Sequence, residues 1–330
     1  MAVTLQEINA LRQKTQAGLM DCKKALTEAN GDMDAAIEIL RKKGQMVAAK
    51  RSDREASEGC VLAKIDGNFG AVLALKCETD FVAKNAEFVE LANKIIDAAV
   101  AARCKTLDDV KNLDIDGVPA SEAVVNRSGV TGEKMELDGY ATVEGEKVVA
   151  YNHMNQSFLC TLVAFNKDCS DELAKGIAMQ VAAMSPIALD ESKISDEDKA
   201  KELAAIIDKT KEDEVKRAIE VAIKKAGINP NLVDSDDHIS SNITKGYITE
   251  EEGAKAREII AAVEPEARKN LNEKKIEMIA QGRLNKYYKE VCLLNQAYID
   301  DSKTSVADYL KSQDKELTVI DFKRYTLRAE

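Results

Sequence analysis

Residues 61–85, "VLAKIDGNFGAVLALKCETDFVAKN", contain the pattern that decides the fold. Two apolar runs flank an Asp-Gly turn signal, which predicts a β-hairpin. Apolar residues at helical spacing follow over about 86–102. A strand-to-helix junction normally holds small, polar turn residues, yet this one contains Asp80, Phe81 and Val82. The stretch therefore predicts a hairpin-then-helix unit with a phenylalanine at the junction.

The hairpin-then-helix pattern occurs a second time in the chain. Residues 147–166, "KVVAYNHMNQSFLCTLVAFN", are typical of another hairpin, and a helix is expected over 171–184. Two such copies predict two related α+β lobes that share a core. The second junction, "NKDCSDEL" at 166–173, is polar, so the topology does not require a phenylalanine there. The residues expected to be buried in the first lobe are Phe88, Leu91, Ile95 and Ile96.

The first helix of the chain is signalled by its N-terminal cap. Thr4 and Glu7 have capping-box spacing, and Leu5, Ile8 and Leu11 share one helical face. A small helical bundle that begins in this way is better suited to docking than to chemistry.

Two further helices complete the predicted bundle. The second is expected over about 16–29 and ends at the Asn30-Gly31 signal. The third begins at Asp32 and is expected to stop near Gly44. Residues 45–57 are charged and lack a wide apolar stripe, which favours a linker.

A charged segment late in the chain predicts an inserted arm. Ser195 and Thr249 begin helical patterns, and Gly227 to Pro230 break the first of them. A polar stretch at 234–246 separates the two, which predicts an antiparallel helical hairpin with a loop-rich tip. The alternation "ELTVIDFKRY" at 316–325 would return a last strand to the second lobe.

The predicted fold class is α+β. It comprises an N-terminal three-helix bundle resembling ubiquitin-associated domains, a two-lobed α+β core with repeated hairpin-helix units, and an inserted helical hairpin or coiled-coil arm. The predicted domain bounds are 1–54 for the N-terminal docking domain and linker, 55–140 for the core N-lobe, 141–186 and 270–330 for the core C-lobe, and 187–269 for the arm.

Composition excludes several classes of function. The net charge of −11 disfavours general nucleic-acid binding. The chain has seven cysteines, an odd number without a Cys-x-x-Cys pair, which favours free thiols in a reducing cytoplasm. No apolar run reaches the roughly 18 residues of a membrane span, and the N-terminus lacks a signal-peptide core. We therefore expect a cytoplasmic protein with neither nucleic-acid nor membrane partners.

The search for catalytic motifs is negative. The chain has no phosphate-binding glycine loop and no Gly-x-Ser-x-Gly elbow. His153 and His238 are its only histidines, which argues against a multi-histidine metal site or a histidine relay. We expect no enzyme activity, no catalytic residue, no cofactor and no metal.

Four stretches carry a family resemblance. They are "NALRQKTQAGLMDCKKALTEANGDMDAAIEILRKKG" (9–44), "IDGNFG" (65–70), "TDFVAKN" (79–85) and "QGRLNKYYKEVCLLNQAYI" (281–299). Together they closely resemble the bacterial elongation factor Ts family, over roughly 1–105, 140–186 and 270–327. The resemblance implies a guanine-nucleotide exchange factor that binds elongation factor Tu in its GDP form. It would disturb the magnesium and phosphate site of that partner, so that GDP leaves and GTP can bind.

The resemblance also implies which residues contact the partner. In the family, the turn that corresponds to Thr79, Asp80, Phe81 and Val82 is pushed against helices of the partner's nucleotide domain. Secondary contacts are implied for Arg12, Leu19, Met20, Lys23 and His153. This chain departs from the family at Leu19, where Met is common, and at Gln180, where relatives often have His. It also ends without the extra C-terminal helix of some relatives.

Other interpretations stay open at this stage. Phe81 lies seven residues before Phe88, so it could instead anchor the apolar stripe of the next helix. The arm could dimerise two complexes or only protrude. The whole chain could be an adaptor that docks through its ubiquitin-associated-like module, without exchange activity. It could also be an enzyme with an undetected carboxylate site between the lobes.

Overall fold

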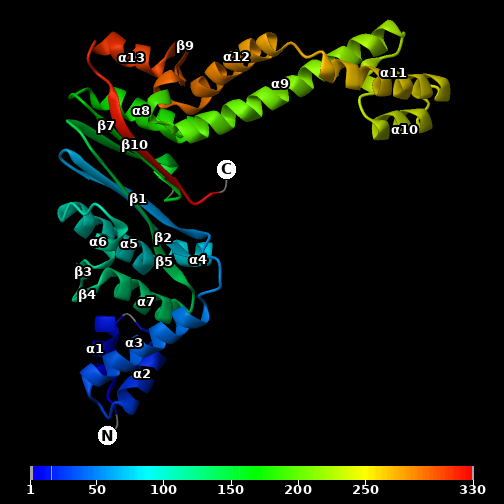
Figure 1. Ribbon diagram of the computed structural model, residues 1–330. Coiled ribbons are helices and arrows are strands. Elements are labelled where there is room, and N and C mark those ends of the chain that lie inside the picture. Colours follow the sequence, from blue (N-terminus) through cyan, green and yellow to red (C-terminus); the bar gives the residue numbers. More distant parts are fainter. Residues whose placement is uncertain (1–2, 16, 156, 329–330) are drawn as a thin grey trace. The chain divides into compact units, whose positions relative to one another are not determined.

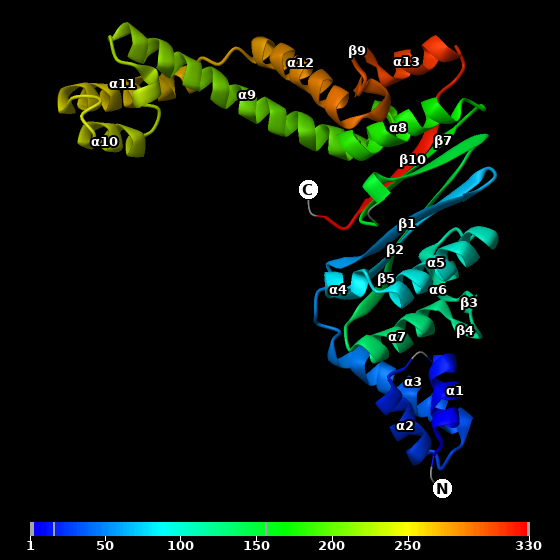
Figure 2. The same cartoon turned by 180° about the vertical axis from the view of Figure 1, so that it is seen from behind.

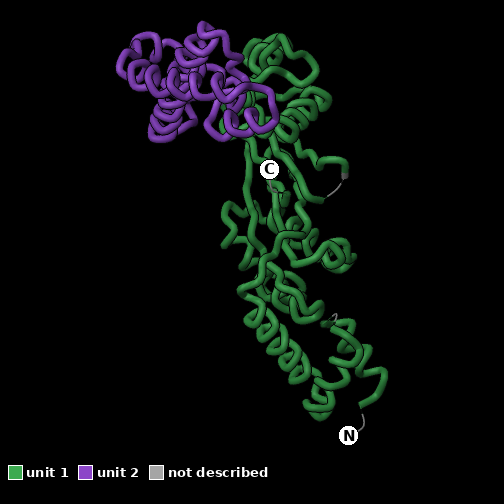
Figure 3. The backbone as a smooth tube through the Cα atoms, turned by 90° about the vertical axis from the view of Figure 1, so that its right-hand side faces the viewer, with its two compact units in different colours: residues 1–189, 293–330 green, residues 190–292 purple. Residues whose placement is uncertain are grey.

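The computed structural model of the chain describes residues 3–15, 17–155 and 157–328, apart from the side chain of Asn155 (Figure 1). It divides into two compact units (Figure 3). Unit 1 comprises residues 1–189 and 293–330, and unit 2 comprises residues 190–292. The mixture of helices and sheets confirms the α+β class.

Unit 1 contains most of the elements. Its helices are α1 (Leu5–Thr15), α2 (Leu19–Glu28), α3 (Met33–Lys50), α4 (Asp80–Ala83), α5 (Ala86–Ala101), α6 (Leu107–Lys111), α7 (Ala120–Thr131), α8 (Asp171–Met184) and α13 (Val306–Gln313). Its strands are β1 (Glu58–Asp66), β2 (Phe69–Cys77), β3 (Asp114–Ile115), β4 (Val118–Pro119), β5 (Met135–Glu144), β6 (Lys147–Asn152), β7 (Leu159–Phe165), β8 (Ala297–Tyr298), β9 (Asp301–Ser305) and β10 (Val319–Thr326). Unit 2 contains α9 (Asp196–Lys225), α10 (Asp236–Thr244), α11 (Glu250–Lys269) and α12 (Glu273–Val291).

The N-terminal helices α1 to α3 pack around a small apolar core of their own. Ile8 and Leu11 lie in this core, whereas Leu5, predicted to share their helical face, is exposed. The predicted capping box is present, because the backbone N–H of Thr4 donates to the Glu7 carboxylate at 2.8 Å. The predicted cap of α3 is also confirmed, since Asp32 accepts from the backbone N–H of Ala35 at 2.9 Å.

The prediction that the third helix stops near Gly44 was wrong. Helix α3 continues to Lys50, so the charged segment begins as helix and not as linker. Gly44 instead lies where α3 crosses α7, and a Cβ atom added to Gly129 would be 2.5 Å from the Gly44 Cα. The two glycines allow this close approach of two backbones. Gly44, which the sequence indicated as a helix stop, therefore permits a packing contact between two helices.

Two antiparallel sheets form the core of unit 1. The strand order is β1-β2-β5 in the first sheet and β10-β7-β6 in the second. The outer face of the first sheet packs against α5, and α8 packs against the second (Figure 2). The inner faces meet in a shared apolar layer that includes Val72 and Leu162. The two predicted hairpin-then-helix units are therefore present and share a core.

Burial in the first lobe follows the sequence pattern. Phe88, Ile95 and Ile96 are fully buried, as predicted, while Leu91 is partly buried at the edge of the same cluster. Strand β2 is buried on both faces, because Leu73 packs toward α5 and Val72 packs toward the second sheet. This double burial fixes the register of the strand that leads into the junction.

The lobe boundary predicted at 140/141 falls inside β5. This strand pairs with β2 from Cys77↔Met135 to Phe69↔Glu144, so the first lobe extends to Glu144. The returning strand predicted near the C-terminus is present as β10, which pairs antiparallel with β7.

Unit 2 is larger than the arm predicted at 187–269. Helix α9 packs against both α11 and α12, so the compact unit continues to residue 292. The predicted helix starts at Ser195 and Thr249 are confirmed as N-caps. The tip is not merely loop, because it contains α10. Within the described part of the chain, none of the helices combines the length and the apolar character that a membrane span needs.

Candidate partner-binding site

The junction after β2 is a single helical turn followed by a second, longer helix. Thr79 is the N-cap of the short helix α4, and its hydroxyl accepts from the Val82 backbone N–H at 3.4 Å. Asn85 is the N-cap of α5 and accepts from the Glu87 backbone N–H at 2.9 Å. The chain therefore turns twice within a few residues, and each turn has its own cap.

The exposed side chain on this turn is Phe81. It is 83% exposed, whereas Val82 and Ala83 are partly buried against the core of the first lobe. The single turn thus anchors one side in the protein and directs the phenyl ring into solvent. This exposure excludes the interpretation of Phe81 as an anchor for α5, a role that the fully buried Phe88 fills.

Asp80 is the acidic member of the turn. Its carboxylate pairs with Lys84 at 2.6 Å, one helical turn further on. The hydrogen bond from Lys84 lowers the pKa of Asp80 below its ordinary value. Asp80 is therefore ionised at neutral pH, beside an exposed aromatic ring.

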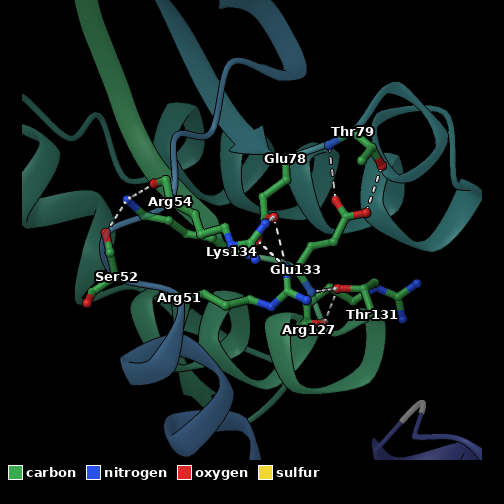
Figure 4. Close-up of polar contacts among 9 residues, drawn as sticks. All are labelled: Arg51, Ser52, Arg54, Glu78, Thr79, Arg127, Thr131, Glu133 and Lys134. Atoms are coloured by element: carbon green, nitrogen blue, oxygen red, sulfur yellow. Dashed lines mark hydrogen bonds and ion pairs between the residues drawn. The ribbon is translucent and has the colours of Figure 1, made fainter.

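Glu133, in the segment between α7 and β5, holds the start of the turn. Its carboxylate accepts from the Thr79 hydroxyl at 2.7 Å and from the Thr79 backbone N–H at 3.1 Å (Figure 4). Hydrogen bonds to an ionised acceptor are stronger than neutral ones. The N-cap of α4 is therefore fixed by two such bonds to a residue far away in the sequence.

Glu78 makes the complementary contact at the same place. Its carboxylate accepts from the Lys134 backbone N–H at 2.6 Å and from the Arg51 guanidinium at 2.7 and 2.8 Å (Figure 4). Burial acts to raise the pKa of Glu78, but the bonds from Lys134 and Arg51 outweigh it and leave this pKa below its ordinary value. The Lys134 ammonium donates to the backbone oxygens of Ser52 and Arg54, at 2.9 and 2.8 Å. The segment that follows α3 is thereby tied to the base of the turn.

The end of the turn is held from α7 as well. Arg127 is buried, and its Nη2 donates to the Asn85 side-chain oxygen at 2.9 Å and also to Glu87. Helix α4 is therefore bracketed by two contacts, Glu133 on Thr79 and Arg127 on Asn85. Neither contact was predicted from the sequence, because the partners are 54 and 42 residues apart and carry no local signal.

The residues expected to make secondary contacts lie in two places. Arg12 on α1 and Leu19, Met20 and Lys23 on α2 are all exposed. They share the surface of the N-terminal bundle, at a distance from α4 in the fold of unit 1 (Figure 1). The structure therefore does not bring them together with Phe81.

His153 lies in the loop between β6 and β7. Its Nδ1 is 3.3 Å from the Tyr151 hydroxyl, and its ring packs edge-on against Phe158. The same loop contacts β1, where the Val61 backbone N–H donates to the Ser157 oxygen at 2.7 Å. Because α4 also packs on β1, the His153 loop and the Phe81 turn lie near the same strand.

Gln180 is fully buried and has an internal role. Its side chain donates to Gln296 and to the Ala297 backbone oxygen, both at 3.1 Å, and accepts from the Ile299 backbone N–H at 2.8 Å. A residue so enclosed fixes the segment after unit 2 and is not placed to touch a partner.

The described residues contain little that is suited to covalent or metal chemistry. No cluster of three or more His, Cys, Asp or Glu side chains in this part of the chain is placed to hold a metal ion. All seven cysteines are unpaired and six of them are buried. Burial raises the pKa of the Cys77 thiol to about 12, so this sulfur is not a nucleophile at neutral pH.

Comparisons with known proteins agree with the motifs. The family model described as Elongation factor TS matches residues 78–329. Proteins named Elongation factor Ts from Bacteroides thetaiotaomicron and Phocaeicola vulgatus are each 60% identical over the full length of both chains. The one from Porphyromonas gingivalis is 41% identical, again over both full lengths. The chain therefore belongs to the elongation factor Ts family.

Proposed function

We propose that this chain is the guanine-nucleotide exchange factor of translation elongation. It binds elongation factor Tu in the GDP form, disturbs the magnesium and phosphate site, and promotes GDP release so that GTP can bind. Membership of the elongation factor Ts family supports this function. The observation that carries the mechanism is Phe81, a phenylalanine 83% exposed on a helical turn that is fixed at both ends.

Phe81 acts as an apolar wedge. Burying a phenylalanine side chain in a partner is favourable by roughly 1.5–3 kcal/mol. Packed helices move between discrete arrangements rather than deforming continuously. Insertion of the ring between two helices of the partner therefore displaces them and weakens the cradle that holds the diphosphate and its divalent cation.

Asp80 supports the wedge by its charge. Its ionised carboxylate lies beside Phe81 and pairs with the exposed Lys84. In the complex it accepts hydrogen bonds from the displaced element of the partner. Thr79 and Val82 complete the contact surface, since Thr79 caps the turn and Val82 seats it on the core.

The protein does this without making or breaking covalent bonds. Exchange follows from linkage, because a factor that weakens nucleotide binding is itself weakened by nucleotide to the same extent. GTP binding then releases the chain, which returns to another GDP complex. The chain works in catalytic amounts although it is not an enzyme in the bond-making sense.

A second contact is made by the N-terminal bundle. Arg12, Leu19, Met20 and Lys23 form an exposed mixed apolar and basic surface on α1 and α2. We assign this surface and His153 to secondary contacts with the same partner. The bundle serves as a docking module of the ubiquitin-associated kind, and the net charge of −11 fits a cytoplasmic protein that does not bind nucleic acid.

Unit 2 is proposed to join two complexes. Its exposed large apolar side chains include Tyr247 at 66% and Met278 at 71%. Sedimentation of the complex with and without residues 190–292 tests this role. Loss of the dimer on removal is expected, and an unchanged stoichiometry contradicts the proposal.

The exchange function is tested by release of labelled GDP from elongation factor Tu. Catalytic amounts of the chain should accelerate release through many turnovers, whereas the spontaneous rate should be seen without it. Binding should also be tighter to the nucleotide-free partner than to its GDP form. Release that is no faster than the spontaneous rate contradicts the function.

A further inference from the structure

The bonds of residues 78–79 with residues 133–134 have a repeating pattern. Main-chain pairing between β2 and β5 ends at Cys77↔Met135. One step further, the Glu78 side chain accepts from the Lys134 backbone N–H, and one step beyond that the Glu133 side chain accepts from the Thr79 backbone N–H. Beyond the last main-chain pair of β2 and β5, the carboxylates of Glu78 and Glu133 therefore accept hydrogen bonds where main-chain oxygens would accept them in a longer ladder.

Glu133 is itself held firmly at the end of α7. Its backbone N–H donates to the Thr131 hydroxyl at 3.3 Å, and this hydroxyl donates to the Arg127 backbone oxygen at 3.2 Å (Figure 4). Arg127 in turn donates to Asn85, at the other end of α4. One end of the turn that bears Phe81 is thus fastened to α7 and the other to the residues directly after α7, and this helix packs closely on α3.

We propose that Glu133 is a positioning residue for Phe81. By holding the Thr79 cap, its carboxylate keeps α4 in the single orientation in which the phenyl ring points into the partner. This role rests on the exchange function proposed above. A turn that samples several orientations would be competent for only part of the time, and apparent affinity falls in proportion to that fraction.

The first test needs no partner. The chain contains no tryptophan, so Phe81→Trp introduces a single fluorophore on the turn. Time-resolved anisotropy of Trp at this position reports how firmly the turn is held. Glu133→Ala should lower the slowly decaying part of the anisotropy, and Glu133→Gln, which keeps one acceptor oxygen, should lie between it and the parent.

The matched control is Glu146→Ala. Glu146 is an exposed acid in the turn just beyond the opposite end of β5, and its side chain has no hydrogen-bond or ion-pair partner among the residues that the structure describes. The Glu146→Ala substitution removes the same charge as Glu133→Ala and should leave the anisotropy of the tryptophan unchanged. Melting curves show whether each variant is folded. A folded Glu133→Ala variant with the parent's anisotropy overturns the proposal, and Glu133→Gln serves in the same way should Glu133→Ala not fold.

The second test measures exchange with Phe81 in place. Glu133→Ala should raise the chain concentration for half-maximal GDP release about tenfold, equivalent to ~1.4 kcal/mol. The maximal rate of GDP release should change less. At saturating concentrations of the chain, enough molecules still reach the competent orientation. Unchanged half-maximal concentration in a variant with a loosened turn overturns the positioning role.

The third test separates positioning from a direct contact of Glu133 with the partner. In a Phe81→Ala background, Glu133→Ala should add little further loss, because its effect passes through the missing ring. Additive losses overturn the proposal. If the unmodified chain releases no GDP at all, the exchange function itself fails, and the partner-free anisotropy still shows whether Glu133 holds the turn.

Discussion

The strand-to-helix junctions of the two hairpin-then-helix units have the same topology but different contents. The first joins β2 to α5 and the second joins β7 to α8. Each junction directly follows the central strand of its sheet in the chain. Both helices begin with a side-chain cap, from Asn85 in one case and Ser170 in the other. Between strand and cap, the first junction inserts the extra turn α4, while the second has no helix.

Polar side chains of the second junction make contacts inside the chain. The Asn166 side chain exchanges hydrogen bonds with the backbone of Glu316 and Thr318, at 2.7 and 2.8 Å. Lys167 pairs with Asp314 at 3.0 Å. The first junction is just as firmly held, but it presents Phe81 to solvent. A fold that closes this connection with polar residues in one copy does not need the phenylalanine in the other, and this supports the binding role that we propose for the ring.

The largest difference in stability is expected between alanine variants of two phenylalanines, Phe88 in α5 and Phe81 in the turn before it. Phe88→Ala leaves a cavity in the core and should lower the free energy of unfolding by roughly 3–5 kcal/mol, because Phe88 is fully buried. Chemical denaturation measures this loss. A cost below about 1 kcal/mol would contradict the assignment of Phe88, rather than Phe81, as the anchor of α5.

A smaller difference should appear between the two caps. Ser170→Ala removes one capping bond, at 3.3 Å to Leu173, and should cost about 1 kcal/mol. Asn85→Ala removes a cap and also the hydrogen bond from the buried Arg127, so about 2 kcal/mol is expected. Equal losses in parallel unfolding curves would show that the bond from Arg127 contributes nothing.

The pH dependence of stability should show the role of Glu78. Because the folded-state pKa of Glu78 is lowered, its contribution to stability is present above its ordinary pKa of 4.5 and is lost as the pH falls through the lowered value. Unfolding curves of the parent should therefore lose stability below pH 4.5 more steeply than those of Glu78→Gln. Parallel pH profiles would argue against an ionised Glu78 at the base of the turn.

The smallest effect is expected from removing unit 2. The residues that flank it are hydrogen-bonded to each other, with the Leu293 N–H 2.9 Å from the Ala188 oxygen and the Leu294 N–H 3.0 Å from that of Leu189. A short linker in place of residues 190–292 should leave unit 1 folded. GDP release should change by less than about threefold, or ~0.65 kcal/mol. Complete loss of exchange in a folded deletion variant would mean that the partner surface lies in unit 2.

Much of the fold is predictable because its signals are local. The hairpins and their helices follow from alternating and helical apolar periods, and α8 begins and ends where the sequence indicates. The caps at Asp32, Ser195 and Thr249 are equally local. The features that were missed depend on tertiary contact. Gly44 has the sequence signature of a helix stop but occupies a helix crossing.

The short elements between residues 103 and 134 and the full extent of unit 2 were missed for related reasons. Helix α7 has no strong apolar stripe, and its packing on α3 and α5 decides its place. Helix α12 belongs with α9 because of contacts that the chain order does not reveal.

The candidate site also has one feature that the sequence predicts and others that depend on tertiary contacts. The exposure of Phe81 follows from comparing the two junctions within one sequence, and the structure confirms it. The residues that fix its turn do not follow from the sequence, since Glu78 and Glu133 reach partners 56 and 54 residues away. Before folding, these acids are indistinguishable from the many others of a chain with net charge −11.

The most direct test of the central claim measures stability and exchange on one variant, Phe81→Ala. The melting midpoint should change little, with less than about 1 kcal/mol lost, because the ring lies in solvent. GDP release from elongation factor Tu should slow on the order of ten- to a hundredfold, since the ring's burial in the partner is lost. A large loss of stability combined with normal exchange per folded molecule would contradict the wedge and make Phe81 a residue of the fold.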